Sequence, residues 1–362
     1  MVAAEGMKWI GGGLVVLALM AFALVAAERR GPRASNTLRR ELLDLGPTAS
    51  PRPVHTERLL DAGTDVLLRG LFTLDRAPRV DQLLEATHAS RGGLPPGMSL
   101  GTTGADSWSA TPSVAQALAQ RLALADATPE HCLDALALGR DLARGGGTTG
   151  LSAALQLTEA VFTSCAQLLT RHPEARSHEP LIAIIDGAPT LARAFREADL
   201  DLQLRTFGSW MRPQDIAELT LEQQRVAQTA RVLPTAFFER HSLLASWSTL
   251  SKTTHAAMES LSRPPLEREL ILEALEAKAA IPLLGISMHW RSAITSHERR
   301  LGLLRMLSLA ADLTRTTPMR ALTEVEAGDH LLVCETARCT LTLREDTVQT
   351  AISLPVAPAR LP

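Results

Sequence analysis

The sequence predicts an all-α fold, an antiparallel helical array with one N-terminal transmembrane helix and a small C-terminal β-meander. Aromatic residues make up only 3% of the 362 residues, and tyrosine is absent. The core must therefore be built mainly from Leu, Ala and Val, a mixture that favours helices over sheets. Prolines recur at intervals that suit the first positions of successive helices. An uncharged apolar span near the N-terminus and β-rich runs near the C-terminus predict the other two parts.

Composition excludes several classes of protein. The chain is 46% hydrophobic and 21% charged, with a formal net charge of −2. A disordered chain, a collagen-like fibre and a polybasic nucleic-acid binder each need a composition far from these values. We therefore expect a folded core and no nucleic-acid partner.

Residues 9–27 follow a short tail, residues 1–8, and form the predicted transmembrane segment. In this span 16 of 19 residues are apolar and none is charged, and a helix of roughly 20 residues crosses a bilayer. Three interpretations stay open. The span is an uncleaved anchor with the body outside the cytoplasm, a secretory signal peptide that ends in small residues, or an anchor with a cytoplasmic body, because five arginines follow it. The lipid bilayer is the partner expected for residues 9–27.

The four cysteines favour a body outside the cytoplasm, because an even number suits an oxidising compartment. If two helices form a hairpin about a turn at 145–149, Cys132 and Cys165 lie nearly level, offset by roughly 3–5 Å along the axes, and can form a disulfide. The alternative is a pair of buried free thiols. Cys334 and Cys339 bracket a predicted β-turn, where facing cysteines are close enough to bond. We expect a single-pass protein of the cytoplasmic (inner) membrane with a periplasmic body.

The domain organisation follows from shifts in composition. Residues 28–58 are rich in Arg and Pro, which predicts a semi-extended juxtamembrane linker. A helical domain is expected over 59–326. It contains a Gly/Pro-rich loop, 91–112, and a loop this long is usually functional or mobile. Trp108 in this loop is a candidate partner-binding residue; the alternative is that it pins the loop onto the helices.

Apolar spacing and proline positions predict the helices of this domain. They are expected near 57–72, 80–88, from 111 onward, and at 128–144, 150–171, 178–185, 189–208, 213–231, 235–262, 266–280 and 283–315.

The C-terminal end changes character within residues 327–354, and a tail, 355–362, follows. Three β-rich runs predict a three-stranded meander, and they are 330–334, 338–343 and 347–354. A meander this small is expected to dock on the last long helix or to be held by a disulfide between Cys334 and Cys339.

Charged residues in two of the expected helices are interpreted as surface features. Arg140, Asp141 and Arg144 read as a charge group at a helix end. Arginines at helical spacing along the last long helix indicate a solvated face, and these are Arg291, Arg299, Arg300 and Arg305.

One stretch carries a family resemblance. Residues 136–146, Leu-Ala-Leu-Gly-Arg-Asp-Leu-Ala-Arg-Gly-Gly, followed by a second apolar helix, resemble a segment of uncharacterised membrane-anchored, mostly helical proteins of environmental bacteria. As in that group, an arginine-studded helix from Glu298 through Leu309 precedes a small β-rich end. The resemblance covers about a third of the chain and implies a membrane-anchored helical fold. It implies no known activity and no catalytic residues.

Two patterns suggest catalysis or metal binding. Residues 97–101 match the G-x-S-x-G pattern of serine hydrolases, with Ser99 as the nucleophile, but the flanking residues predict neither the strand nor the helix that this turn needs. His172, Glu174 and His178 fall within one short segment and are ligand types that zinc accepts. The alternative for that segment is a solvated loop between helices.

We expect a membrane-anchored helical scaffold or protein-interaction module of the bacterial cell envelope, with another envelope protein as the candidate partner. No cofactor and no metal is expected. The alternative is an envelope hydrolase that uses Ser99 or a site at His172 and His178. The scaffold is preferred because each catalytic pattern lacks its structural context.

Overall fold

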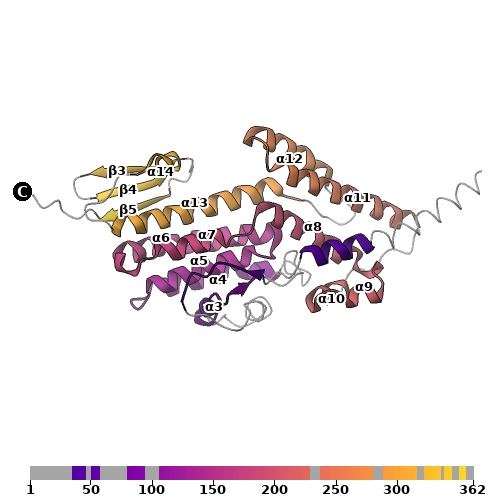
Figure 1. Ribbon diagram of the computed structural model, residues 1–362, viewed down its shortest axis with the longest axis horizontal. Helices are drawn as coiled ribbons and strands as arrows, with labels where there is room; N and C mark the ends of the chain where they lie inside the picture. The colour runs from indigo at the N-terminus through magenta and orange to yellow at the C-terminus, as the bar shows by residue number, and fades with distance from the viewer. Residues whose placement is uncertain are drawn as a thin grey trace, which may run out of the picture.

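Figure 1 shows the computed structural model, in which long helices lie alongside one another and a small sheet sits at one end. The structure describes residues 35–45, 50–57, 80–93, 106–228, 237–279, 288–315, 322–335, 338–344 and 350–355. Over these ranges the protein is mostly helical with a small C-terminal antiparallel sheet, as the sequence predicts. Among the helices so described, none combines the length and apolar character that a membrane crossing needs. The predicted span, 9–27, lies outside the described residues.

A helical hairpin forms the centre of the fold. It consists of α5 (Pro129–Ala143) and α6 (Gly147–Arg171). Thr128 caps α5 by accepting from the backbone N–H of His131, and Pro129 stands at the first helical position, where its missing N–H costs nothing. Gly145 ends α5 at a φ of +83°, a left-handed conformation that glycine adopts without strain. The predicted hairpin is confirmed, with a tighter turn than expected.

Four helices pack around this hairpin (Figure 1). They are α3 (Val80–Ala86), α4 (Asp106–Leu122), α7 (His178–Asp186) and α13 (Trp290–Arg315). Leu136, Leu157 and Leu307 belong to the shared core and are fully buried. A buried leucine contributes roughly 1.5–3 kcal/mol relative to an exposed one, so this layer holds α5 firmly in place.

The remaining helices pack at the other end of the molecule, where α8 joins the two halves. They are α8 (Leu191–Phe207), α9 (Pro213–Ala217), α10 (Leu221–Gln228), α11 (Phe237–Ser260) and α12 (Pro265–Ala279), with the 3-10 turn η2 (Gly208–Trp210). A second 3-10 turn, η1 (Pro173–Ala175), follows α6 and contacts α6 and α13 instead. Phe195 packs against Trp290 with ring centroids 6.3 Å apart, and Phe207 stacks on Trp247 at 4.2 Å. Two aromatic pairs thus pack along α8.

The C-terminal meander is confirmed. It consists of β3 (His330–Glu335), β4 (Arg338–Leu343) and β5 (Ala351–Pro355), paired antiparallel in that order and preceded by α14 (Glu324–Asp329). Leu341, Ile352 and Leu354 are buried in the same core cluster as α6 and α13. The sheet therefore docks on the last long helix.

The predicted linker, 28–58, is wrong for the part that the structure describes. Residues 35–45 form a helix, whose Leu38 and Leu42 are buried in a cluster with Phe207. Residues 50–57 also belong to the body, because they include a strand and buried polar side chains. An Arg/Pro-rich composition predicts a solvated linker because composition alone does not show which residues elsewhere in the chain will bury these side chains.

Two helix boundaries also differ from the prediction. The loop expected at 91–112 ends earlier, because α4 begins at Asp106 and contains Pro112. The single helix expected over 213–231 divides into α9 and α10. Thr220 starts the second of these, since its backbone N–H donates to the side chain of Gln223 and its hydroxyl accepts from the backbone N–H of Gln223, a reciprocal cap that opens a new helix.

Candidate functional site

Two short strands, each of two residues, bring distant segments together over α5. Strands β1 (Ser50–Pro51) and β2 (Arg91–Gly92) pair antiparallel. The backbone N–H of Arg52 extends the pairing by donating to the carbonyl oxygen of Ser90 at 3.2 Å. This β1–β2 clasp fixes the residues that follow β1 and those that precede β2.

His55, His88 and Asp134 meet beside the clasp. Nε2 of His55 lies 2.8 Å from Oδ1 of Asp134, and Nε2 of His88 lies 2.9 Å from the same oxygen. All three side chains are buried, and the two imidazole rings meet edge to face at 5.8 Å. We call these residues the His–His–Asp cluster, in which one carboxylate oxygen holds two imidazole nitrogens close together.

Burial and hydrogen bonding oppose each other in this cluster. Burial alone would raise the pKa of Asp134, but the hydrogen bonds from His55 and His88 outweigh it, so this pKa lies below its ordinary value. Burial lowers the pKa of His55, which the hydrogen bond to Asp134 only partly offsets. Nδ1 of His55 has no hydrogen-bond partner within the part of the chain that is described. The cluster therefore joins an ionised carboxylate to an imidazole that favours its neutral form.

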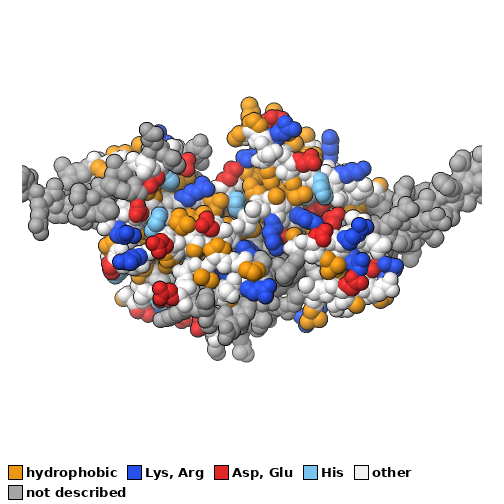
Figure 2. Space-filling model, viewed as in Figure 1, with side chains coloured by type: hydrophobic (Ala, Val, Ile, Leu, Met, Phe, Trp, Pro, Cys, Tyr) orange, Lys and Arg blue, Asp and Glu red, His pale blue; other side chains and the backbone are white. Residues whose placement is uncertain are grey.

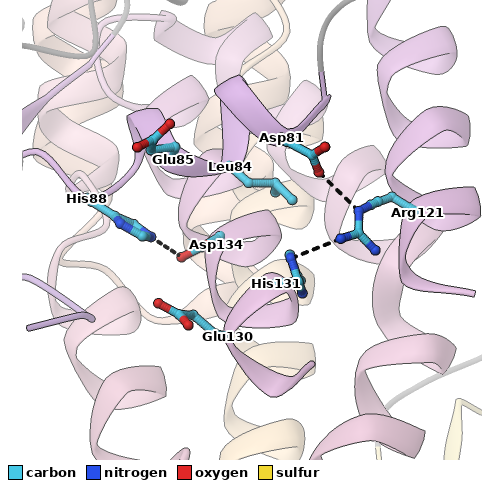
Figure 3. A pocket seen from close by; sticks show the side chains of 8 residues that line it. All are labelled: Asp81, Leu84, Glu85, His88, Arg121, Glu130, His131 and Asp134. Atoms are coloured by element: carbon cyan, nitrogen blue, oxygen red, sulfur yellow. Dashed lines mark hydrogen bonds and ion pairs between the residues drawn. The ribbon is translucent and has the colours of Figure 1, made fainter. Parts of the chain in front are cut away.

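A cavity of about 290 Å³ opens beside the cluster, and His88 and Asp134 form part of its wall. The other residues that line it are Asp81, Leu84, Glu85, Arg121, Glu130 and His131. Figure 3 shows these side chains around the opening, with His88 and Asp134 on one side and Arg121 and His131 on the other. A small ligand in the cavity would thus reach the His–His–Asp cluster.

Carboxylates dominate the charge on the cavity wall. Arg121 donates to Asp81 and Asp126, each at 3.0 Å, so its positive charge is compensated. Glu85 and Glu130 add two further carboxylates to the wall. This imbalance favours a cation over an anion in the cavity.

A second buried polar cluster lies two helical turns farther along α5. Asp141 accepts from Arg52 through Oδ2 at 2.8 Å and from Arg140 through Oδ1 at 3.0 Å. The three side chains are fully buried at these contacts. This Arg–Asp–Arg cluster was not foreseen, because Arg140 and Asp141 read as a charge group at a helix end and Arg52 as part of a linker.

Backbone carbonyls complete the hydrogen bonding of these arginines. Arg52 donates to the carbonyl oxygens of Ala89 and Thr87, and Arg144 donates to those of Gly92 and Pro51 at 3.0 and 3.1 Å. Burial lowers the pKa of Arg52 to about 10, which still leaves it charged at neutral pH. The arginines therefore bind the clasp to α5.

The arginine stripe of α13 is not one solvated face. Arg291 and Arg299 form ion pairs with Glu276 and Glu159. Arg300, in contrast, is fully buried and donates to Oγ1 of Thr158 at 3.2 Å, and burial lowers its pKa to about 9. Arg299, the preceding residue, is partly exposed, whereas the side chain of Arg300 enters the core between α5 and α6.

The three candidate zinc ligands do not come together. Nδ1 of His172 lies 3.0 Å from Oε1 of Glu174, and both side chains are exposed. Nδ1 of His178 instead contacts the hydroxyl of Ser308 on α13 at 2.8 Å. Helix packing therefore engages His178 and separates it from the other two candidates.

The other predicted site residues divide into two groups. Ser99 lies outside the described residues, and so does the side chain of Trp108, whose backbone belongs to α4. Both candidate cysteine pairs are joined, Cys132 with Cys165 and Cys334 with Cys339. Cys334 and Cys339 are also direct cross-strand partners in the β3–β4 hairpin.

The sequence held one usable signal for the His–His–Asp cluster. Asp134 and Asp141 lie seven residues apart, two helical turns, so both fall on the same face of α5. That helix is otherwise apolar along most of its length, and a carboxylate in such a run needs a buried partner. His55 and His88 give no such signal, because each belongs to a different segment and no motif spacing joins them.

No protein-family model, curated protein or solved structure matches the chain.

Proposed function

We propose that the protein is a single-pass, membrane-anchored helical scaffold or interaction module of the bacterial cell envelope, with its body on the periplasmic side. The pairing of all four cysteines carries this proposal. Disulfides persist in oxidising compartments and are rare in the cytosol. The apolar span 9–27 supports the anchor, because it is long enough to cross a bilayer.

The second disulfide argues most strongly for this compartment. Cys334 and Cys339 lie opposite each other across the β3–β4 hairpin near the C-terminal end. A meander of this size is marginal without further support. A covalent link across its hairpin is useful only where thiols are oxidised.

The surface of the helical body also suits an interaction role. Leu266 and Leu270 lie one turn apart on α12 and are 77% and 63% exposed. Figure 2 shows hydrophobic side chains on this part of the surface among charged ones. Two leucines are enough for a small contact and far too few for an obligate interface.

A topology reporter fused after Pro362 tests the compartment. An alkaline phosphatase that folds only outside the cytoplasm is expected to be active on the full chain. A matched fusion that lacks residues 9–27 is expected to be inactive, because the reporter then stays in the cytoplasm. Activity of a cytoplasm-only reporter on the full chain would contradict the proposal.

A further inference from the structure

We propose that His55, His88 and Asp134 bind a divalent transition-metal ion such as Zn²⁺, with one coordination position open to the adjacent cavity. One ligand atom from each residue lies within 4.8 Å of the other two, and all three residues are buried. This site is independent of the compartment proposed above, since it rests on different residues.

The observed distances leave little rearrangement for an ion to enter. Imidazole nitrogens and carboxylate oxygens bind Zn²⁺ at about 2.0–2.2 Å, which separates the ligand atoms of a tetrahedral site by about 3.3 Å. The two Nε2 atoms now lie 2.8 and 2.9 Å from Oδ1 of Asp134. Each nitrogen–oxygen pair must therefore open by only about half an ångström, and the two nitrogens, which lie within 4.8 Å of each other, must close to about 3.3 Å, movements that rotation of the side chains can supply.

The chemistry of the ligands selects among cations. Two imidazoles and one carboxylate suit Zn²⁺ and similar borderline ions, whereas Ca²⁺ and Mg²⁺ prefer sites built from oxygen alone. The carboxylates of Glu85 and Glu130 on the cavity wall add negative charge beside the site and attract any of these cations. The imidazoles are therefore expected to select Zn²⁺ over Ca²⁺ and Mg²⁺. The carboxylates of the cavity wall are expected to attract all three cations at longer range.

The cavity gives the site its open position. Protein zinc sites with four protein ligands are closed and structural, whereas three ligands leave a position for water or a small ligand. The cavity of about 290 Å³ begins at His88 and Asp134, so the fourth position faces a space that can hold either. Figure 3 shows the carboxylate of Asp134 directed toward His88 at the edge of the opening.

Zinc titration of the purified full chain, in detergent, oxidised and stripped of metal by chelation, tests the site. Calorimetry is expected to show one Zn²⁺ per chain, with binding of Mg²⁺ and Ca²⁺ at least 100-fold weaker. Asp134→Asn and His88→Ala are expected to weaken zinc binding by at least tenfold. His172→Ala is the matched control, because His172 is an exposed histidine, and it should bind zinc like the unaltered protein.

Cobalt binding to the unaltered protein is a second readout, and it does not depend on whether a variant folds. Co²⁺ added to the stripped protein is expected to give visible absorption typical of low coordination number, which one equivalent of Zn²⁺ removes. Stoichiometric binding of neither ion to the unaltered chain would overturn the proposal. Equal loss of zinc in His172→Ala and in Asp134→Asn would also overturn it.

Discussion

Helix α5 presents two buried aspartates, and their surroundings differ in kind. Asp141 lies between two guanidinium groups and is sealed from solvent. Asp134 lies between two imidazoles, and a cavity opens beside it. Guanidinium groups are permanent cations that cannot become metal ligands, whereas a neutral imidazole can exchange its hydrogen bond for a bond to a metal. The same helix face thus carries one fixed structural contact and one that can change its partner.

The largest effect is expected from Asp141→Asn. The substitution leaves Arg52 and Arg140 buried without a counter-charge, and loss of one partner from a buried ion pair costs about 3–5 kcal/mol. Unfolding by urea should show this decrease in the free energy of unfolding. The control is Asp81→Asn, whose carboxylate pairs with Arg121 at the surface and is 77% exposed; it should cost about 1 kcal/mol or less. Equal costs would show that the Arg–Asp–Arg cluster does not hold the fold.

Removal of the Cys132–Cys165 disulfide is expected to lower the free energy of unfolding nearly as much as Asp141→Asn does. Cys132 lies two residues before Asp134, so this link fixes the end of α5 that carries the His–His–Asp cluster. The disulfide spans 33 residues, and closing a loop of that size stabilises a protein by about 3–4 kcal/mol in the chain-entropy model. Replacing both cysteines with alanine should lower the free energy of unfolding by about that amount.

The hairpin disulfide provides the comparison for this prediction. Cys334 and Cys339 are separated by only 5 positions, and a loop that short gives about 2 kcal/mol in the same model. If replacing Cys334 and Cys339 lowered the free energy of unfolding more than replacing Cys132 and Cys165, the prediction from loop length would be wrong.

Asp199 is a buried carboxylate without a guanidinium partner, and its pKa shows what such a partner contributes. Asp199 on α8 accepts from Gln203, but burial raises its pKa from 3.8 to about 6. Between about pH 4 and pH 6 the folded state therefore holds a proton that the unfolded state has released. Stability should fall as the pH rises through this window and remain low above it.

Asp199→Asn is expected to remove this pH dependence. The variant should equal the unaltered protein at pH 4 and exceed it by about 2–3 kcal/mol at pH 8, since one pKa unit corresponds to about 1.4 kcal/mol. Thermal unfolding across the pH range measures the difference. A constant difference between the two proteins at all pH values would contradict the raised pKa.

The smallest effect on stability is expected from Asp134→Asn. The side chain amide keeps one acceptor oxygen for the two histidines and leaves no buried charge unpaired, so the cost is about 1–2 kcal/mol. Denaturant unfolding in the presence of a chelator measures it beside Asp141→Asn. A cost as large as that of Asp141→Asn would mean that both aspartates are structural.

Local signals explain which parts of this fold the sequence predicts. Thr128 and Pro129 before α5 and Gly145 after it act within a few residues, so the boundaries of this helix follow from the sequence. The β1–β2 clasp has only two residues in each strand and leaves no periodic pattern. Arg52 looks like a linker residue until Asp141, 89 positions away, is placed beside it.

The candidate site is non-local for the same reason. His55 and His88 become neighbours only because the clasp closes and α5 lies beneath it. The candidate ligands His172 and His178 are close in sequence, but the packing of α7 on α13 places His178 against Ser308 instead. Closeness in sequence was therefore a poor guide to closeness in space for the histidines of this chain.

The thermal unfolding midpoint with and without zinc tests the contrast between the two aspartates most directly. A ligand at 100 times its dissociation constant adds about 2.7 kcal/mol to the stability of the protein that binds it, which raises the midpoint of a protein this size by roughly 4 °C. Metal-free unaltered protein is expected to show this rise on addition of Zn²⁺, and Asp134→Asn, which binds zinc at least tenfold more weakly, is expected to show at most about half of it. An unchanged midpoint in the unaltered protein, or an equal rise in both proteins, would contradict the assignment of Asp134 to a metal site.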